Sequence, residues 1–356
     1  MMNIEEFRKK KIGARITDFF NSKPCAACTT GIASLDTAIN GGWKAGTVVA
    51  LGGIPGIGKT TLALLFARAA AKEGHSVLDL STEQSADKET AIMICQALQE
   101  ADPENKITLQ DVIDRKDESI RDSALQAAFP DNLTIIDASD WEHTAEEIPS
   151  MVECLLADDD DDEAENDKFP VVIIDSLQQI RPADANMTYK DVIDNAVSIC
   201  KHIAVHYNVA VLILSAVNRD YYDSVAPVPL QALYGSSAID YAMDLIITVQ
   251  MHGCSPSLSS VAAMAADVRK LDMTVIKQKD GPVGRTIHLE FDAQYCCFAS
   301  RNGEETVNMT NYENHVDDFL LPDVDADDVV TVRGSLASDD DYDDIGDLFF
   351  AGISKN

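Results

Sequence analysis

The residues best suited to chemistry form one glycine-rich stretch, Gly53-Ile-Pro-Gly-Ile-Gly-Lys-Thr-Thr61. Its spacing is typical of the phosphate-binding P-loop, where glycines let the backbone turn tightly and its N–H groups attract a phosphate. In such loops the lysine, here Lys59, reaches the β- and γ-phosphates, and the next hydroxyl, here Thr60, holds Mg²⁺. We therefore predict a site for ATP and Mg²⁺ that is formed by Gly53, Gly56, Ile57, Gly58, Lys59, Thr60 and Thr61.

A carboxylate at the end of an apolar run is the second candidate for this site. The run Phe169-Pro-Val-Val-Ile-Ile-Asp175 is rich in β-branched residues, as buried central strands are. Such a strand carries a carboxylate to the edge of a phosphate site, so we predict that Asp175 and Thr60 hold Mg²⁺ together. The alternative is an ordinary buried strand followed by an Asp-Ser helix cap.

Hydrolysis also needs a group that orients the attacking water. Glu83, in Leu80-Ser-Thr-Glu-Gln-Ser85, follows the first apolar run after the predicted P-loop helix. The carboxyl ends of parallel strands face one crevice, so Glu83 is our candidate for the general base. The alternative is a solvent-exposed glutamate near the start of a helix.

Strands and helices that alternate along the chain must position these residues. A last pair of strands, 273–277 and 285–291, is predicted to form a hairpin around Lys279-Asp-Gly-Pro-Val-Gly284. The order predicts an α/β fold with a mainly parallel sheet flanked by helices and a C-terminal hairpin. The other predicted strands are 47–52, 76–80, 133–137, 171–174, 210–214 and 245–250, and the helices are 59–72, 87–100, 145–156 and 192–206.

Composition divides the chain into three parts. Residues 1–29 are interpreted as an N-terminal helix and linker, 30–300 as the ATPase domain, and 301–356 as an acidic, disordered tail. Residues 302–356 hold 15 acidic and two basic side chains, a large share of the net charge of −32, and 158–167 form a second acidic segment. Three roles remain open for the tail: binding a basic partner protein, competing with DNA as a mimic of its phosphate charge, or solubility alone.

The sequence contains no apolar run of 18 residues and no signal-peptide core, so we expect a cytoplasmic protein without a membrane segment. Its eight cysteines form no secretory pattern. A zinc site at Cys25 and Cys28 would need two more ligands, and the nearest histidines, His75 and His143, lie at no recognisable zinc spacing. Reduced, mostly buried thiols are therefore the simpler interpretation.

Several short motifs occur in one order along the chain. They are Thr30-Gly-Ile-Ala-Ser-Leu-Asp36, the P-loop, Ser81-Thr-Glu-Gln-Ser85, Val172-Ile-Ile-Asp-Ser-Leu-Gln178, Leu214-Ser-Ala-Val-Asn-Arg219 and Val275-Ile-Lys-Gln-Lys-Asp-Gly-Pro-Val-Gly284. As an ordered set they resemble the ATPase domain of DnaB-type replicative helicases over about residues 30–300, and less closely the RecA-like ATPases of the RadA and KaiC type. The resemblance implies a RecA-like P-loop NTPase that forms a ring, usually a hexamer, with ATP bound between subunits and single-stranded DNA through the centre.

The resemblance also implies residues that act on a neighbouring subunit. The matching hairpin positions are Lys277, Gln278 and Lys279, which implies that the two lysines contact the γ-phosphate of the next subunit during catalysis. Lys279 stands where the family has an arginine finger; it keeps the charge but lacks the planar fork that contacts two oxygens. A solvated hairpin edge is the alternative for both lysines.

The chain departs from the family at three places. Ala216 follows Ser215 where the helicases have a glutamine that senses the γ-phosphate, and Tyr234-Gly-Ser-Ser237 replaces a charged pore segment. Only about 29 residues precede the domain, so we do not expect primase to be recruited through a helical N-terminal domain. The N-terminal helix, with Phe7, Phe19 and Phe20, is a candidate to dock on an adjacent subunit, with packing on its own domain as the alternative.

Two functions follow from these observations. The first is an ATP-hydrolysing, DnaB-like helicase or motor that acts on single-stranded DNA in replication or recombination. The second is a RadA- or KaiC-like regulatory or loader ATPase that a protein partner controls and that does not unwind DNA. The ordered motifs favour the first function, and the altered pore segment favours the second.

Overall fold

The computed structural model describes residues 10–21, 27–115, 118–126, 129–158, 168–222, 226–233, 237–253 and 263–300. The predictions for the acidic tail, most of the acidic segment 158–167, Phe7, Cys25 and the segment 234–236 lie outside these residues. Among the described helices, none combines the length and the hydropathy that a membrane crossing requires.

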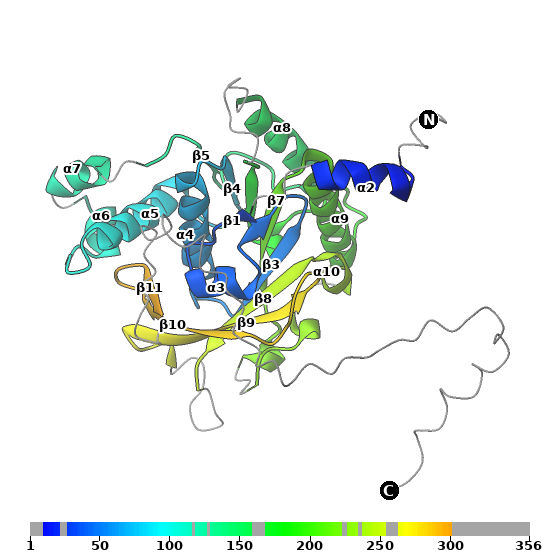
Figure 1. The fold of residues 1–356 in the computed structure, drawn as a ribbon. Coiled ribbons are helices and arrows are strands. Elements are labelled where there is room, and N and C mark those ends of the chain that lie inside the picture. The colour runs from blue at the N-terminus through cyan, green and yellow to red at the C-terminus, as the bar shows by residue number, and fades with distance from the viewer. Residues whose placement is uncertain are drawn as a thin grey trace, which may run out of the picture. The chain divides into compact units, whose positions relative to one another are not determined.

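One sheet of nine strands runs through the described chain (Figure 1). In chain order its strands are β3 (Val48–Gly53), β4 (Val77–Ser81), β5 (Leu133–Ile136), β6 (Val171–Asp175), β7 (Ala210–Ala216), β8 (Leu245–Met251), β9 (Val268–Gln278), β10 (Thr286–Asp292) and β11 (Cys297–Ser300). Their spatial order is β11-β10-β9-β8-β3-β7-β6-β4-β5. The strands from β8 to β5 are parallel, and β9, β10 and β11 are antiparallel to their neighbours. The predicted α/β sheet with its C-terminal hairpin is confirmed.

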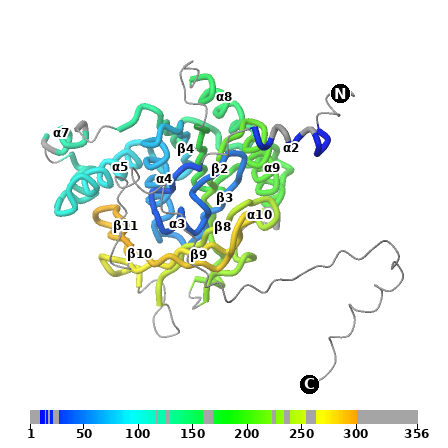
Figure 2. The backbone as a smooth tube through the Cα atoms, in the orientation of Figure 1, coloured from blue at the N-terminus to red at the C-terminus, as the bar shows by residue number. Residues whose placement is uncertain are grey.

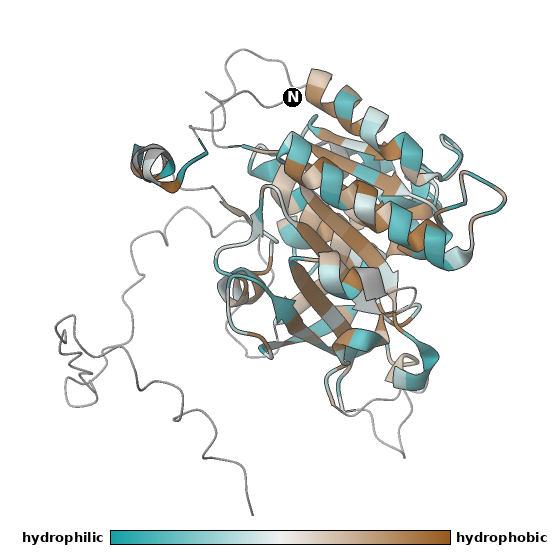
Figure 3. Ribbon diagram, turned by 90° about the vertical axis from the view of Figure 1, so that its right-hand side faces the viewer, coloured by the Kyte–Doolittle hydropathy of each residue, from teal (hydrophilic) through white to brown (hydrophobic). Residues whose placement is uncertain are grey.

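Helices cover both faces of the parallel strands, which explains why these strands are continuous apolar runs. β3, β4, β6 and β8 are buried at every position. Helix α4 (Lys59–Lys72) packs in one core cluster, and α8 (Ile148–Asp158) and α9 (Tyr189–Tyr207) pack in a second cluster. In Figure 3 the strands are mostly brown, whereas the helices in front of them mix hydrophobic and hydrophilic residues.

The remaining helices show how local capping sets the boundaries. α9 begins three residues before the predicted start because Thr188 accepts a hydrogen bond from the Asp191 N–H, and the Asp191 carboxylate accepts one from the Thr188 N–H. The predicted helix 59–72 coincides with α4, and 87–100 lies within α5. The other helices are α2 (Ile12–Asn21), α3 (Ala33–Ala38), α5 (Ala86–Ala101), α6 (Leu109–Ile113), α7 (Glu118–Gln126) and α10 (Ser237–Ala242).

Two segments far apart in the sequence meet beside the sheet. Figure 2 shows the blue chain around α3 next to the yellow and orange strands β9 and β10. The Asn40 side-chain amide donates to the Asp280 carbonyl at 2.7 Å, and Arg285 donates to the Thr37 carbonyl at 3.2 Å. A small two-stranded sheet, β1 (Ala27–Cys28) and β2 (Trp43–Lys44), frames α3. The sequence pattern did not predict this small sheet or strand β11.

Helix α2 carries an apolar face at helical spacing. Ile12, Ile16, Phe19 and Phe20 are 73%, 50%, 73% and 80% exposed. The predicted helix 4–20 is thus observed from Ile12, within the part of the N-terminal region that the structure describes. Exposure of four large apolar side chains on one short helix is unusual for a surface that contacts only water.

Candidate active site

The P-loop connects the carboxyl end of β3 to the first turn of α4. Gly56 and Gly58 adopt left-handed backbone conformations, with φ of 77° and 107°, which explains why glycine is needed at these two positions. The Lys59 ammonium donates to the carbonyls of Gly53 and Ile54 at 3.0 and 3.2 Å. Burial lowers the pKa of Lys59, while the nearby carboxylates of Asp175 and Glu83 oppose this shift. The positive charge of Lys59 is thus held over the loop.

Thr60 and Asp175 lie together at the centre of the site. The Thr60 hydroxyl donates to the Asp175 Oδ2 at 2.5 Å. Burial raises the pKa of Asp175 to about 6, and the hydrogen bond from Thr60 and the charge of Lys59 lower it only in part. A buried carboxylate beside a hydroxyl is the hard oxygen pair that Mg²⁺ prefers, and a cation would remove the cost of the buried charge. These two residues therefore fit Mg²⁺.

Glu83 lies beside this pair because β4 and β6 are neighbours in the sheet. Ser81 of β4 pairs with Asp175 of β6, and Thr82 donates from its N–H and its hydroxyl to the Asp175 carbonyl. The Glu83 Oε1 accepts a hydrogen bond from the Ser176 hydroxyl at 2.9 Å. The two loops are thus tied together, and they place Glu83 and Asp175 on one cavity.

That cavity has a volume of about 480 Å³. Lys59, Thr60, Thr61, Glu83 and Asp175 line it together with Gly56 and Gly58, so these predicted residues meet in one place. Gly53 is the last residue of β3 and does not line the cavity. Ile57 differs, because its side chain is fully buried in the core and only its backbone belongs to the loop. A larger cavity, of about 660 Å³, lies among α5, α6 and α7 and contains none of the predicted site residues.

Gln178 is a cavity residue that sequence analysis did not single out. Its amide nitrogen donates to the Ser215 hydroxyl, and its carbonyl oxygen accepts from the Ala216 N–H, both at 2.9 Å. Gln178 and Ala216 both line the cavity. The chain has no glutamine after Ser215, but Gln178, from the loop after β6, contacts Ala216, which occupies that position. The position of Gln178 depends on the 3₁₀ turn Leu177–Gln179, which the hydrophobic periodicity of the sequence does not predict.

Arg269 and Phe291 also line the P-loop cavity, and the sequence analysis did not identify them as site residues. Arg269 donates to the Gly56 carbonyl of the P-loop at 2.8 Å, and its guanidinium lies 5.7 Å from the centre of the Phe291 ring. The Phe291 ring also packs so closely on Gly58 that a side chain there would clash, at 2.9 Å. The predicted strand began at residue 273, whereas β9 begins at Val268, which brings Arg269 into the sheet.

Lys277 and Lys279 do not reach the P-loop cavity of their own chain. Lys279 forms an ion pair with the Asp244 Oδ1 at 2.6 Å, and Lys201 contacts the other oxygen of the same carboxylate. Lys277 donates to the carbonyl of Asp240. Burial lowers the pKa of Lys277, and the neighbouring Lys279 adds to this shift. The hairpin lies at the start of β8, whereas the P-loop follows the carboxyl end of β3, so the two occupy opposite edges of the sheet.

Comparison with known proteins now decides the family. Residues 27–300 match the family model of the DnaB-like helicase C terminal domain. The chain belongs to this family. Its members are NTP-hydrolysing helicase domains, so the chain is a P-loop ATPase of the replicative-helicase type. The predicted resemblance to this family and the predicted ATPase activity are both confirmed.

Solved structures support the same fold. One of them, described as an ATPase domain, is 22% identical, with a TM-score of 0.66, and the match covers 81% of this chain and 98% of that chain. A structure of a DnaB-like replicative helicase and its interactions with primase is also 22% identical, with a TM-score of 0.65 over 83% of this chain and 69% of the other. At this identity the likeness concerns the fold alone.

A short segment is similar to a second group of proteins. It is 47% identical over 57 residues to the DNA repair protein RadA of Mycolicibacterium smegmatis, and 46% identical over 59 residues to that of Mycobacterium tuberculosis. The match spans only 12% of the length of these relatives and 16% to 17% of this chain. It therefore carries no conclusion about the activity of the whole protein.

Proposed function

We propose that this chain is an ATP-driven motor that acts on single-stranded DNA, in replication or recombination, as a ring of identical subunits. The observation that carries the proposal is the meeting of Lys59, Thr60, Glu83 and Asp175 on one cavity of a helicase-family domain. The set contains a cation for the phosphates, two oxygen ligands for Mg²⁺ and a carboxylate for the attacking water.

Each residue has a separate task in ATP hydrolysis. Lys59 neutralises charge on the β- and γ-phosphates, and the backbone N–H groups of the loop hold the remaining phosphate oxygens. Thr60 and Asp175 hold Mg²⁺, which supplies positive charge at the phosphate oxygens when bound. Glu83 orients the attacking water and accepts its proton. Gln178 contacts Ala216 and takes the place of the family's γ-phosphate sensor.

The position of the lysine hairpin supports action between subunits. Lys277 and Lys279 lie at the sheet edge opposite to their own P-loop, so they reach a γ-phosphate only across a subunit boundary. In the free chain, the Asp244 carboxylate holds Lys279. The exposed apolar face of α2, formed by Ile12, Ile16, Phe19 and Phe20, docks on the adjacent subunit and closes the ring.

Two measurements test whether the chain forms a ring and whether it binds single-stranded DNA. The mass of the assembly in solution should rise to that of a closed ring when Mg²⁺ and a non-hydrolysable ATP analogue are added. Under the same conditions a fluorescent single-stranded oligonucleotide should bind, with an affinity that falls steeply as salt rises. A protein that stays monomeric and does not bind the oligonucleotide at low salt would contradict the proposal.

A second candidate function has support from one observation. Ala216 stands where the family has the sensor glutamine, which favours a regulatory ATPase that a partner protein controls. In that account, the acidic tail binds the partner, and hydrolysis does not respond to DNA. Deletion of residues 302–356 distinguishes the two, because a motor keeps or gains DNA affinity without the tail, whereas a partner-controlled ATPase loses its partner.

A further inference from the structure

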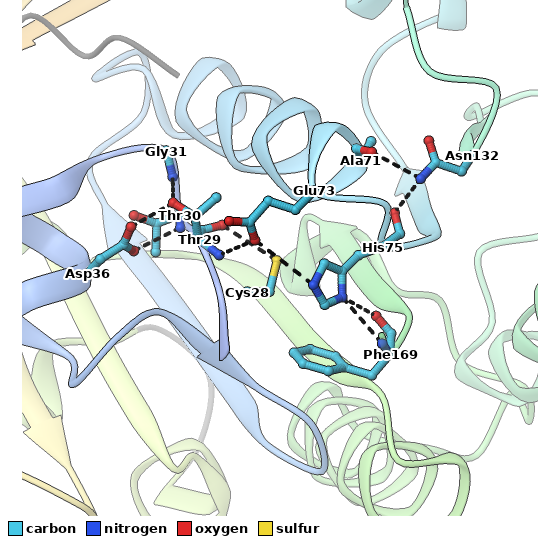
Figure 4. A network of polar contacts seen from close by, with 10 residues as sticks. All are labelled: Cys28, Thr29, Thr30, Gly31, Asp36, Ala71, Glu73, His75, Asn132 and Phe169. Carbon is cyan, nitrogen blue, oxygen red and sulfur yellow. Dashed lines mark hydrogen bonds and ion pairs between the residues drawn. The ribbon is translucent and has the colours of Figure 1, made fainter. Parts of the chain in front are cut away.

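Three residues with metal-binding side chains meet at the end of α4 that is remote from the P-loop. Cys28 lies in β1, Glu73 follows the last turn of α4, and His75 precedes β4 (Figure 4). One ligand atom from each residue, the sulfur, a carboxylate oxygen and a ring nitrogen, lies within 4.8 Å of the other two. Because α4 contains 14 residues, its two ends are about 21 Å apart. The cluster is therefore separate from the ATP site.

The His75 ring is oriented as a metal ligand would be. Its Nδ1 lies 2.8 Å from the Phe169 carbonyl and 3.3 Å from the Phe169 N–H, so the Phe169 backbone holds the ring through this nitrogen. The other ring nitrogen, Nε2, faces the Glu73 carboxylate, whose Oε2 lies 4.0 Å away. His75 is only 1% exposed. A buried imidazole nitrogen and a carboxylate oxygen at this separation can share a cation placed between them.

The other two side chains are held by their own partners. The Thr29 N–H donates to the Glu73 Oε2 at 2.9 Å, and the Thr29 hydroxyl donates to Asp36 at 2.6 Å. Cys28 is fully buried, and its thiol donates a hydrogen bond to the Thr29 carbonyl at 3.6 Å. Burial raises the pKa of the Cys28 thiol, and the charge of Glu73 adds to this effect. Figure 4 shows the sulfur, the carboxylate and the imidazole converging on one point.

The loop between Glu73 and His75 is also fixed. Gly74 has a φ of 86°, a conformation that glycine adopts easily, and it lets both flanking side chains turn to the same side. The Asn132 amide donates to the carbonyls of Ala71 and His75, at 3.1 and 2.9 Å. The ligands are thus positioned before any ion arrives, which lowers the entropy cost of binding.

We propose that Cys28, Glu73 and His75 bind a zinc ion that fastens the small sheet β1–β2 to the end of α4. A thiolate, an imidazole and a carboxylate are the ligand types that zinc accepts, whereas Mg²⁺ and Ca²⁺ prefer oxygen alone. Zinc bonds of 2.0 to 2.3 Å place neighbouring ligand atoms roughly 3.5 Å apart, so the side chains must close by about 1 Å. Three protein ligands leave the fourth tetrahedral position to water, and binding releases the proton of the Cys28 thiol.

The His75 ring has the type of hydrogen-bond partner that histidines in zinc sites have. A zinc-binding histidine usually donates its second N–H to a carbonyl or carboxylate, and the Phe169 carbonyl lies 2.8 Å from the His75 Nδ1. The rival account is that the ammonium of Lys168 alone balances Glu73. Burial raises the pKa of the Glu73 carboxyl, and the charge of Lys168 opposes this shift. The two accounts differ in one measurable respect, since only the first requires a metal.

The experiment uses full-length protein from which metal has been removed with a chelator, titrated with Co²⁺. We expect one equivalent to bind and to produce the absorption of a thiolate–cobalt bond, which one equivalent of Zn²⁺ then abolishes. Binding in two buffers of different ionisation enthalpy should release about one proton per ion. Wild-type protein without the thiolate absorption would overturn the proposal and leave Lys168 as the only counter-charge.

Variants show which side chains carry the effect. Cys28→Ser should lose the thiolate absorption, and His75→Gln should weaken Co²⁺ binding by about 100-fold or more. Cys154→Ser changes an exposed thiol and should leave the absorption intact. Asp272→Asn disrupts a second histidine–carboxylate cluster, which contains His252 and His288 but no thiol, and should also leave it intact. Absorption that survives in Cys28→Ser would contradict the assignment.

Discussion

The hydroxyl of Thr60, in the first turn of α4, donates to the carboxylate of Asp175, at the end of β6, across 2.5 Å. This contact joins two motifs that are 115 residues apart in the sequence. It pairs the two residues that we propose to hold Mg²⁺, and it ties the P-loop helix to β6, the neighbour of the strand β4 that leads to Glu83. We therefore expect hydrolysis to depend on how β4 and β6 hold their carboxyl ends beside α4.

The pKa of Asp175 predicts how the affinity of Thr60 and Asp175 for Mg²⁺ depends on pH. Because burial raises that pKa to about 6, protons compete with Mg²⁺ below this pH, and the Mg²⁺ affinity should fall by about tenfold per pH unit. Mg²⁺-dependent ATPase activity measured from pH 5 to pH 8 should show this fall. In Asp175→Asn activity should be lost at every pH, and a wild-type profile that is flat between pH 5 and pH 7 would contradict the assignment.

The variant Glu83→Gln distinguishes an effect on ATP hydrolysis from an effect on ATP binding. The glutamine keeps an oxygen that accepts from the Ser176 hydroxyl, so the loop should stay in place and the Kd for ATP should change little. Loss of the carboxylate that takes the proton should lower kcat by about 100-fold or more. Single-turnover hydrolysis and nucleotide binding measure the two effects, with the exposed Glu104→Gln as control. A variant that retains full kcat would remove Glu83 from the mechanism.

Mixed rings test the proposal that Lys279 acts on a neighbouring subunit. Subunits with Lys59→Ala lack their own site but keep their hairpin, whereas subunits with Lys279→Ala keep their site but lack the hairpin cation. Each variant alone should be inactive, and a mixture should recover part of the ATPase rate because some boundaries combine an intact site with an intact hairpin.

The control mixture combines Lys59→Ala with Lys190→Ala, which removes an exposed lysine that pairs with Asp194. This mixture should be active in proportion to its intact subunits. Lys279→Arg should raise the rate, because a guanidinium contacts two phosphate oxygens. If Lys279→Ala subunits alone hydrolyse ATP normally, the hairpin is a solvated edge and not part of the site.

Glu89 gives a separate prediction about stability. Its carboxyl is fully buried on α5, and burial raises its pKa to about 7, with Asp175 and Asp137 adding to the shift. The folded chain therefore holds a proton that the unfolded chain releases near its ordinary value, so stability falls as pH rises from about 4.5 through about 7. The full fall would be on the order of 3 kcal/mol. Urea unfolding of Glu89→Gln should show a smaller decrease between pH 5 and pH 8 than wild type, and an equal decrease would refute this role.

Much of the fold followed from local signals in the sequence. The helix 59–72 was predicted with its observed ends because the glycines of the P-loop stop the strand and Lys59 opens an apolar, helix-forming run. The strands with Asp175 and Glu83 at their carboxyl ends were also predictable, since parallel strands bring those ends to one edge. Their meeting on a single cavity depends on that shared edge.

The missed residues depend on tertiary contacts that have no periodic signal. Arg269 enters the site because β9 begins five residues before the predicted strand, where polar residues hide the pattern. Gln178 reaches Ala216 through a single turn of 3₁₀-helix. His75 lies 47 positions after Cys28, so the spacing rules for zinc motifs did not connect them, although β1 and the connection between α4 and β4 bring them together.

The rate of ATP hydrolysis with and without single-stranded DNA tests the central claim most directly. It should be measured at low and moderate salt, with Lys59→Ala as the blank and Lys72→Ala, at the far end of α4, as the matched control. The proposed motor predicts strong stimulation by DNA that Lys59→Ala abolishes and Lys72→Ala retains. Hydrolysis that depends on Lys59 but is indifferent to DNA would contradict the motor account.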